Sequence, residues 1–482
     1  MIKNSNLIPA DNRWTFEFID EMMSEILKIN DETFKFDLYP NQIEIVSSQQ
    51  MIDAYCSHAM PVMYNHWKFG KDYLQNHNRY KSGRMGLAME IVSNTDPCIS
   101  YNMEDNSATT TSLVLAHANV GHNAFFKNNY LFKTWTNADS IVDYLLFAKK
   151  YIRQCEDKYG EELVELVLDA CHSLQYVGVD KYKRVVKSKS KMNEELSAID
   201  AENERLFDML MDTTTIKKKK DMKDIKFPIQ PEENILYFIE KYSPKLDEWK
   251  RELIRIVRKI SQYFYPQILT KTINEGLATF THYHIMYNLW EKGIIPESSM
   301  FEFLESHSSV IWQPDFNSKY YNGFNPYALG FAIFMDIKRM CLNPTDEDRE
   351  WFPDVVGKNW IEMTHYVMDN FKDDTFIIQF LSPKVMRDLR LFYILDEAKD
   401  PNYLVKRIHN DRGYREIRKK LSDSYDWIHN FPDIQVESVD MMGDRILKLK
   451  YYKHNDYDLE TKNRKKTLKY IEYLWGYPVE IV

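Results

Sequence analysis

The chain has 482 residues, 44% of them hydrophobic and 28% charged, enough to bury a large core in one or more globular domains. Its formal net charge is −9 and no basic stripe interleaved with aromatic residues stands out, which argues against a nucleic-acid partner. The five cysteines are odd in number and show no C-x-x-C spacing, so neither a disulfide framework nor a zinc ribbon is expected. The N-terminus does not resemble a signal peptide, and no uncharged run reaches the roughly 20 residues that a bilayer requires. We therefore expect a cytoplasmic protein that is not integral to a membrane.

Helical patterns dominate the first four hundred residues. Glycine and proline number only 14 and 17, which favours helices. Trp14, Phe18, Met22 and Ile26 recur at intervals of four and predict an amphipathic helix over 13–29. Similar patterns predict helices within 137–175, 245–264, 268–292 and 326–342.

A polar, charged segment at 185–234 separates two helical regions. It contains four consecutive lysines at 217–220 and two prolines near its end, which is typical of a solvated linker. The lysine run could also bind an acidic partner. We expect residues 1–184 and 235–399, on either side of this linker, to form one core domain.

Strand and helix patterns alternate after Lys399. They predict a strand over 402–410, a helix over 411–425, a hairpin around Gly443, a second helix and a last strand that ends the chain. The order βαββαβ is typical of the split-βαβ or ferredoxin-like arrangement. The predicted fold is therefore mainly α, a large multi-helix domain followed by a small α+β domain at 400–482. We expect a binding or regulatory role for the small domain, because it has no dense cluster of titratable groups.

The most informative motif is HANVGHNAFF at 117–126, which runs on from a helix with Asn106 or Ser107 as its candidate N-cap. His117 and His122 are five residues apart, and positions i and i+5 of an α-helix point about 140° apart. Both rings could face one metal ion if Gly121 permits a π-turn, a feature that is frequent at functional sites. Alternatively, His117 is buried and His122 begins an unrelated turn, and the spacing alone does not decide.

Two carboxylate–histidine pairs are further candidate ligands. Glu275 and His282 are seven residues apart and lie on one helix face, and a buried Glu275 would need a cation, hydrogen-bond donors or a salt bridge. Asp169 and His172 have the i, i+3 spacing of helix-bundle metal sites. One carboxylate with two histidines would suit zinc with an open position, whereas two facing pairs plus His117 could build a dinuclear centre, with iron or manganese as alternatives.

Two other residues are candidates for a catalytic role. Glu104 lies one helix length before His117, and Tyr327 opens a predicted helix as a possible hydroxyl donor. The chain has no P-loop, no G-x-G-x-x-G and no G-x-S-x-G motif, so nucleotide-binding and serine-hydrolase functions lack their usual signatures.

A family resemblance extends over nearly the whole chain. The segments that carry it are DPCISYNMEDN, LAHANVGHNAFFKNNYLF, SIVDYLLFAKKYI, VGVDKYKR, IVRKISQYFYPQ, NEGLATF, NPYALGFAIFMDIKR and FLSPKVMRDLR. They resemble the stage V sporulation protein R (SpoVR) family. The resemblance implies a bacterial cytoplasmic protein associated with the spore cortex, the peptidoglycan of the developing spore, or with stress in bacteria that do not sporulate. It implies envelope-synthesis or stress-kinase operon proteins as partners, and no settled activity.

The segment NEGLATF, residues 274–280, is also similar to the third-ligand segment of gluzincin-type zinc peptidases. This more distant, zincin-like resemblance implies that His117, His122 and Glu275 are the three ligands of a divalent metal ion such as zinc. It also implies that Tyr327 stabilises an oxyanion.

The chain departs from the gluzincin pattern in two respects. Ala118 follows His117, so the glutamate that normally activates the water is missing, and the second histidine is shifted by one residue. Because efficient peptide hydrolysis usually needs a proton shuttle, Glu104 is nominated as the replacement.

These observations leave two hypotheses about function. The first is a metal-binding protein with His117, His122 and Glu275 as ligands and His282 as a further candidate, which hydrolyses an amide or peptide with the help of the metal. The second is a non-catalytic adaptor or regulator of cell-envelope enzymes, which acts through its C-terminal domain and whose histidines are structural. A cytoplasmic location favours the adaptor, because mature peptidoglycan lies outside the membrane.

Overall fold

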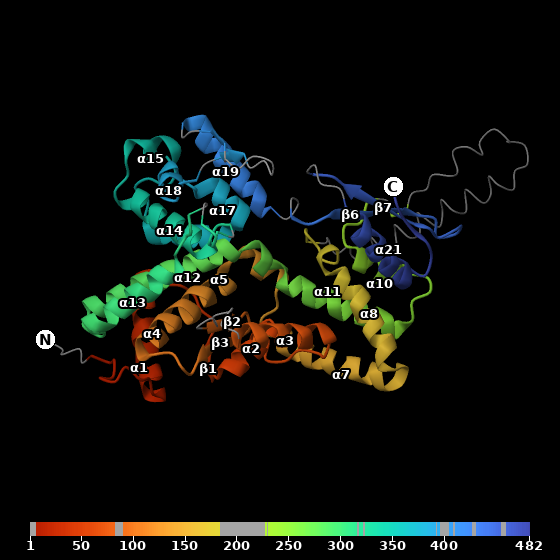
Figure 1. Cartoon of the computed structure of the whole chain (residues 1–482), viewed down its shortest axis with the longest axis horizontal. Coiled ribbons are helices and arrows are strands. Elements are labelled where there is room, and N and C mark those ends of the chain that lie inside the picture. The colour runs from red at the N-terminus through yellow and green to blue at the C-terminus, as the bar shows by residue number, and fades with distance from the viewer. Residues whose placement is uncertain are drawn as a thin grey trace, which may run out of the picture. The chain divides into compact units, whose positions relative to one another are not determined.

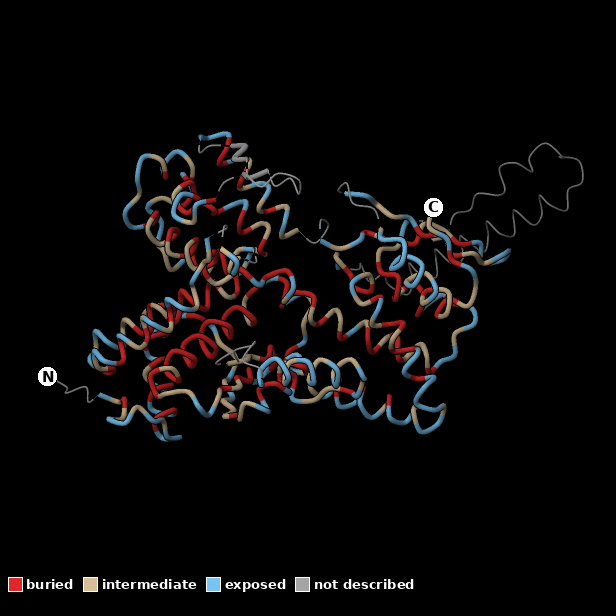
Figure 2. Tube along the Cα trace, viewed as in Figure 1, coloured by how far each residue is buried: buried red, intermediate tan, exposed pale blue. Residues whose placement is uncertain are grey.

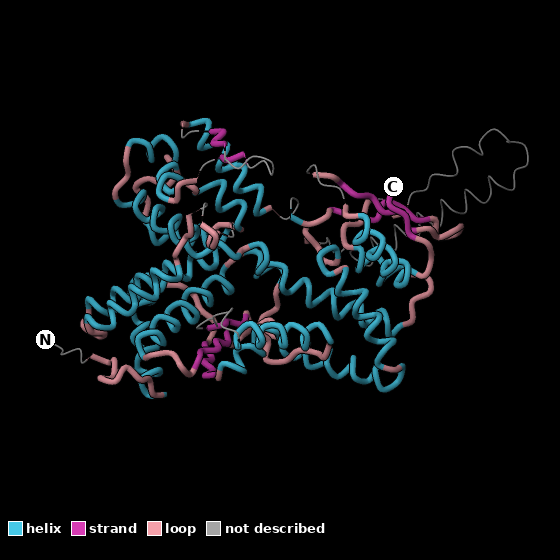
Figure 3. The backbone as a smooth tube through the Cα atoms, in the orientation of Figure 1, coloured by secondary structure: helices cyan, strands magenta, loops and turns pink. Residues whose placement is uncertain are grey.

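The structure, a computed structural model, describes residues 6–81, 90–183, 227–228, 230–315, 318–321, 323–391, 393–395, 404–407, 410–426, 430–454 and 459–482. These residues form mainly helices with a few short strands, as Figure 3 shows, and the prediction of a mainly α protein with a small C-terminal sheet domain is confirmed. The chain divides into two compact units, Met1–Asp157 with Tyr263–Asn430 (unit 1) and Lys158–Gln262 with Phe431–Val482 (unit 2). Within the described residues, no helix is long and apolar enough to span a membrane.

Helix α12 (Lys271–Glu291) is the centre of unit 1 (Figure 1). Its buried residues lie on every side of the helix, as expected for a helix that other elements surround (Figure 2). The helices that pack against it are α1 (Phe16–Ile29), α4 (Ala108–Ala116), α13 (Glu297–Val310), α14 (Pro326–Leu342), α16 (Trp360–Asn370) and α17 (Asp373–Phe380).

Glycines bring α12 and α14 into close contact. A Cβ atom on Gly276 of α12 would overlap the backbone of Gly330 in α14, and a Cβ on Gly330 would overlap the backbone of α12. The first turn of α12 is fixed by Asp373, whose carboxylate accepts hydrogen bonds from the backbone N–H groups of Thr272 and Ile273 at 2.9 and 2.8 Å. Helix α12 is therefore tightly held where it carries Glu275.

The helices predicted from apolar patterns form close to their expected bounds. Thr15 caps α1 by accepting a hydrogen bond from the backbone N–H of Phe18, and Asn325 caps α14 in the same way. The pattern at 137–175 is divided into α7 (Ile141–Tyr159) and α8 (Glu161–Ser173) by Gly160, whose φ is +91°. Further helices in the described part of the chain are α2 (Ser48–Cys56), α3 (Trp67–Lys81), α5 (Asn123–Asn128), α6 (Tyr130–Trp135), α10 (Ile235–Tyr242), α11 (Glu248–Leu269), α15 (Asp346–Trp351), α18 (Pro383–Asp388), and the short η1 (Asn30–Phe34) and η3 (Gln175–Val177).

Unit 1 also contains a three-stranded sheet that was not predicted. Its order is β1 (Asn41–Val46), β3 (Cys98–Met103) and β2 (Glu90–Ser93), with β1 parallel and β2 antiparallel to β3. None of the three strands shows the strict alternation of buried and exposed positions that marks a half-buried strand. Strand β2 is an edge strand and begins at Glu90, which pairs with Asn102.

The sheet of unit 2 has the order β6 (Asp433–Val439), β7 (Leu447–Tyr452) and β8 (Val479–Ile481). Strands β6 and β7 form the predicted antiparallel hairpin, and β8 pairs in parallel with β7 after helix α21 (Thr461–Trp475). Helix α8 packs against α21, and α10 packs against β6. The described residues 158–183 and 235–262, which were expected in the core domain, therefore belong with the C-terminal sheet.

The ferredoxin-like assembly predicted for 400–482 needs a correction. Its expected first strand is β5 (Leu404–Arg407), which pairs with β4 (Tyr393–Leu395) and not with the C-terminal sheet. Its expected first helix is α19 (Asp411–Tyr425), which packs against α17 because Tyr414 and Ile417 are buried in the core of unit 1. The predicted elements form, but the C-terminal sheet begins only after residue 430. Of the predicted linker, residues 185–226 and 229 lie outside the described residues.

Candidate metal centre

A π-helix, η2 (His117–His122), connects α4 to α5 without a break in the helical path. Because a π-turn closes after five residues, it places His117 and His122 on the same side, and their ring centroids lie 4.7 Å apart. The π-turn interpretation of the spacing is therefore confirmed. Ser107 is the N-cap of α4 and accepts a hydrogen bond from the backbone N–H of Thr110.

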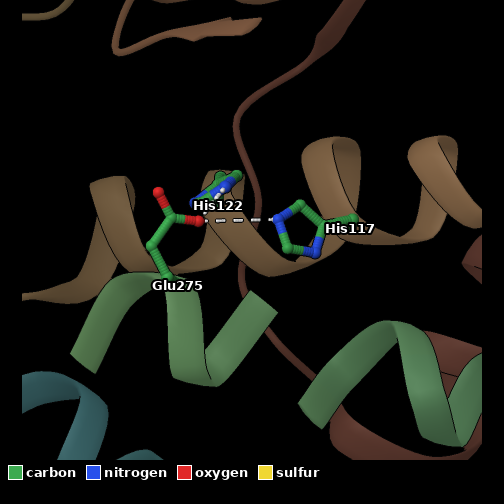
Figure 4. A group of neighbouring side chains, drawn as sticks. All are labelled: His117, His122 and Glu275. Atoms are coloured by element: carbon green, nitrogen blue, oxygen red, sulfur yellow. Dashed lines mark ion pairs between the residues drawn. The ribbon is translucent and has the colours of Figure 1, made fainter. Parts of the chain in front are cut away.

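Small residues allow η2 to lie directly against α12. A Cβ on Gly121 would lie 2.5 Å from the Cα of Ala278, so this contact is possible only with glycine at position 121. Ala278 and Gly276 belong to the NEGLATF segment, where Ala278 faces η2 and Gly276 faces α14. This packing directs Glu275 towards the two histidines, as Figure 4 shows.

Three side chains meet at this contact. Glu275 Oε2 lies 3.4 Å from His122 Nε2 and 3.7 Å from His117 Nε2, and the ligand atoms of the three residues lie within 4.8 Å of one another. These separations exceed a normal hydrogen bond. They are close to the roughly 3.3 Å that separates two ligand atoms around a tetrahedral zinc ion with bonds of about 2.05 Å.

The atoms that face one another lack other partners. His117 Nε2 and Glu275 Oε2 are buried and have no hydrogen-bond partner among the described residues. Such orphaned atoms are costly unless something satisfies them. Two imidazoles and one carboxylate are donors that suit zinc with an open coordination position, so the residues fit a divalent cation.

The electrostatics of the centre favour an ionised carboxylate. Burial would raise the pKa of Glu275, but His122 and His117 hold this pKa far below its ordinary value. Burial would lower the pKa of His122, but the charge of Glu275 and the hydrogen bond to Asn274 raise it above its ordinary value. A bound cation would replace the proton that His122 otherwise takes up.

A second carboxylate, which the sequence analysis missed, faces the same centre. Glu90 Oε1, at the start of β2, lies 3.7 Å from His117 Nε2, and the edge strand β2 packs against η2. Glu90 is not one of the three residues whose ligand atoms all lie within 4.8 Å of one another, so it stands beside the group. Burial raises its pKa, the two histidines oppose this shift, and Glu275 adds to it. The sequence contained a weak signal, because Glu90 directly precedes the apolar pair Ile91 and Val92.

The carboxylate side of the centre is the more exposed one. The side chains of His117 and His122 are 3% and 10% exposed, whereas those of Glu275 and Glu90 are each 17% exposed. The two carboxylate side chains are therefore the less buried part of the centre.

Tyr327 lies next to the centre, as predicted. Its ring is nearly parallel to that of His117, with the centroids 6.2 Å apart, and Pro326 and the Asn325 cap position it at the first turn of α14. Burial raises the pKa of Tyr327, and the charges of Glu275 and Glu90 raise it further. The phenol therefore stays protonated and can donate a hydrogen bond.

His282 lies behind His117 and uses both ring nitrogens in hydrogen bonds. Its Nδ1 is 2.9 Å from His117 Nδ1, and its Nε2 is 2.9 Å from Nδ1 of His307 in α13. His282 is therefore not placed as a metal ligand. The pKa of His282 lies well below its ordinary value, mainly because the residue is buried and also because of the neighbouring histidines. Burial and His117 lower the pKa of His307 to about 4.

Three other predicted residues are not brought to this group. Glu104 is exposed in the turn after β3, where its backbone carbonyl accepts a hydrogen bond from Trp14 Nε1 at 3.1 Å. Asp169 and His172 lie on α8, in unit 2, whereas the group is formed by residues of unit 1. Among the described residues, the group found is His117, His122 and Glu275, so the two pairs are not seen to build a dinuclear centre.

Two family models match the chain. The one described as "SpoVR like protein" matches residues 13–430, and the one described as "SpoVR-like C-terminal domain" matches residues 432–482. A protein of Escherichia coli (strain K12), described as "Uncharacterized protein YcgB", is 49% identical over 485 residues, which cover 99% of this chain and 94% of the relative. No solved structure matches. The border between the two matched regions falls where the C-terminal part of unit 2 begins.

Proposed function

The chain belongs to the SpoVR family, and from this premise we propose that it is a metal-dependent hydrolase of amide or peptide bonds. His117, His122 and Glu275 bind one divalent cation, with zinc the best match to the donor set and iron or manganese as alternatives. The observation that carries the proposal is the buried group of three ligand atoms, in which His117 Nε2 and Glu275 Oε2 have no hydrogen-bond partner among the described residues.

A metal site explains this arrangement better than a structural ion pair. An ion pair would be expected to close to hydrogen-bond distance, whereas the carboxylate lies 3.4 and 3.7 Å from the two imidazoles. A cation between the three groups would satisfy both orphaned atoms. The site offers three protein ligands rather than four, which is the pattern of catalytic and not of structural zinc sites.

The residues around the centre can each take a separate role in hydrolysis. A divalent cation bound here would polarise a carbonyl group and lower the pKa of a water molecule. Glu90 takes the role of the missing glutamate at position 118 and accepts a proton from the attacking water. Tyr327 donates a hydrogen bond to the oxygen on which negative charge develops. We assign this role to Glu90 rather than to Glu104, because Glu90 faces His117 whereas Glu104 is exposed in the turn after β3.

The family suggests where this chemistry is used. As part of the same proposal, the protein acts in the cytoplasm on peptide-bearing precursors of peptidoglycan, during sporulation or under stress. The resemblance to proteins of spore cortex formation supports this setting. The adaptor alternative, in which the histidines are structural, does not explain why ligand atoms that face one another lack hydrogen-bond partners among the described residues.

Glu90→Gln tests the hydrolase, with Glu104→Gln as the matched control. Both variants and the wild type are incubated with peptidoglycan-derived peptides and with fluorogenic peptides, and cleavage is followed by mass spectrometry. We expect Glu90→Gln to keep its metal and lose about 10²- to 10⁴-fold in rate, and Glu104→Gln to behave as the wild type. Metal-loaded wild type that cleaves none of these peptides would contradict the hydrolase and favour the adaptor.

A further inference from the structure

Three buried histidines from three different elements form a continuous hydrogen-bonded chain. His117 Nδ1 meets His282 Nδ1 at 2.9 Å, and His282 Nε2 meets His307 Nδ1 at 2.9 Å. The exposed fractions of the three residues are 2%, 1% and 4%. The ring of His307 is stacked on Phe303 and has its edge against Phe331, so aromatic packing holds the far end of the chain.

Each of these hydrogen bonds contains one proton, so neutral rings can order their protons in only two ways. If His117 Nδ1 carries the proton, His282 accepts it at Nδ1 and donates from Nε2 to His307, and the lone pair of His117 Nε2 faces Glu275. In the reverse order His117 carries its proton on Nε2, and that nitrogen cannot bind a metal ion. The order of protons in the chain thus decides whether His117 can be a ligand.

We infer that His282 and His307 are positioning residues that hold His117 in the tautomer whose Nε2 lone pair points into the metal centre. This role rests on the proposed metal site. His282 and His307 would set the affinity of that site for the metal ion without touching the ion. Partners of this kind orient a ligand ring and increase its basicity, and their loss typically costs 10- to 100-fold in metal affinity.

The two amide substitutions of His282 separate hydrogen bonding from general polarity. In His282→Asn the side-chain oxygen can take the place of Nδ1 and accept from His117, whereas in His282→Gln it lies near the position of Nε2. We expect the dissociation constant for zinc, measured by competition with a chelator, to stay within a few-fold of wild type in the Asn variant. We expect it to rise about 10- to 100-fold in the Gln variant.

His307 allows the same comparison, because it also accepts through Nδ1. We expect His307→Asn to keep the affinity, and His307→Phe to weaken it several-fold because the N–H of His282 is left unpaired. The matched control is His284→Phe, which changes a buried histidine two residues along α12 that contacts Phe280 and Lys338 instead of His117. It should leave the zinc affinity unchanged.

The outcomes separate this inference from the proposed function. Wild type that binds zinc, with Gln and Asn variants at His282 of equal affinity, would overturn the inference and leave the metal site standing. Equal losses in His282→Gln and His284→Phe would also overturn it, because the effect would then be a general loss of packing. Wild type that binds none of zinc, iron and manganese would overturn the site and the inference together.

Discussion

Gly121 lies where the π-helix touches α12, and the contact leaves no room for a side chain. The same close approach gives Glu275 its distances to the two histidines. Because Gly121 has no Cβ atom, η2 can approach α12 closely enough for His117, His122 and Glu275 to meet. The geometry of the candidate centre therefore depends on a glycine that has no chemical role in it.

Replacing Gly121 by alanine should separate η2 from α12. Overpacking of this kind costs about 1–3 kcal/mol, and we also expect zinc affinity to fall because the ligands move apart. Gly70→Ala is the control, since Gly70 lies in α3 with nothing within 4 Å of the added atom, and it should be neutral or stabilising by up to about 1 kcal/mol. Thermal unfolding and zinc titration measure both effects. Unchanged zinc affinity in Gly121→Ala would show that the contact does not set the site.

The sequence identified three of the side chains at the centre and missed the fourth. His117, His122 and Glu275 could be predicted because a local spacing and a local motif marked them. Glu90 comes from a four-residue edge strand, and His117, which it faces, lies on a different element, so no local pattern linked Glu90 to the histidines. Glu104 was chosen for its distance along the chain, which does not report where a turn directs a side chain.

A hydrogen bond to His284 links helix α12 to α14, and this hydrogen bond depends on the protonation state of His284. Lys338 of α14 donates a hydrogen bond to Nε2 of His284 at 2.6 Å, and Nδ1 of His284 is bonded to the carbonyl of Phe280. Burial and the positive charge of Lys338 lower the pKa of His284 to about 4. A protonated His284 would present a second cation to Lys338 and lose its acceptor.

Acid should therefore weaken the contact between these helices. Because the folded pKa of about 4 lies below the roughly 6.5 of an unfolded histidine, the stability from neutral His284 is complete above about pH 6.5 and is lost as the pH falls to about 4. We expect the stability difference between metal-free wild type and His284→Phe to shrink by up to about 3 kcal/mol between pH 7 and pH 4. Thermal unfolding at both pH values measures it, and a constant difference would contradict the role of His284.

Secondary structure could be predicted where a long apolar pattern repeats. Which elements pack against one another could not be predicted. The helices α1, α12 and α14 follow from the apolar patterns over 13–29, 268–292 and 326–342. Helix α19 was also expected, but nothing in its own sequence indicates that Tyr414 and Ile417 pack in unit 1 and not beside the C-terminal sheet. The small sheet of unit 1 was missed because its strands do not alternate strictly between buried and exposed positions.

The chain passes between the two units three times, and a linear search for linkers could not reveal this path. The candidate centre lies entirely in unit 1, whereas residues 432–482, matched by the C-terminal family model, lie in unit 2. Metal binding and any partner binding by the C-terminal sheet can therefore be changed independently.

Trp475→Ala tests this independence. Trp475 is fully buried in unit 2, donates a hydrogen bond to the backbone carbonyl of Arg445 and packs near Phe238. Its loss should destabilise unit 2 by about 3–5 kcal/mol, visible in calorimetry, without changing zinc affinity at a temperature where both units are folded. A weaker zinc affinity under those conditions would show that the centre depends on unit 2.

The central claim is that His117, His122 and Glu275 hold a metal ion, and elemental analysis tests it most directly. The protein is purified without added metal or chelator, alongside His117→Ala and Glu275→Ala, with circular dichroism to show that all three are folded. We predict about one equivalent of zinc, iron or manganese in the wild type and its loss in both variants. A folded wild type that contains none of these metals, and takes up none when they are supplied, would contradict the account.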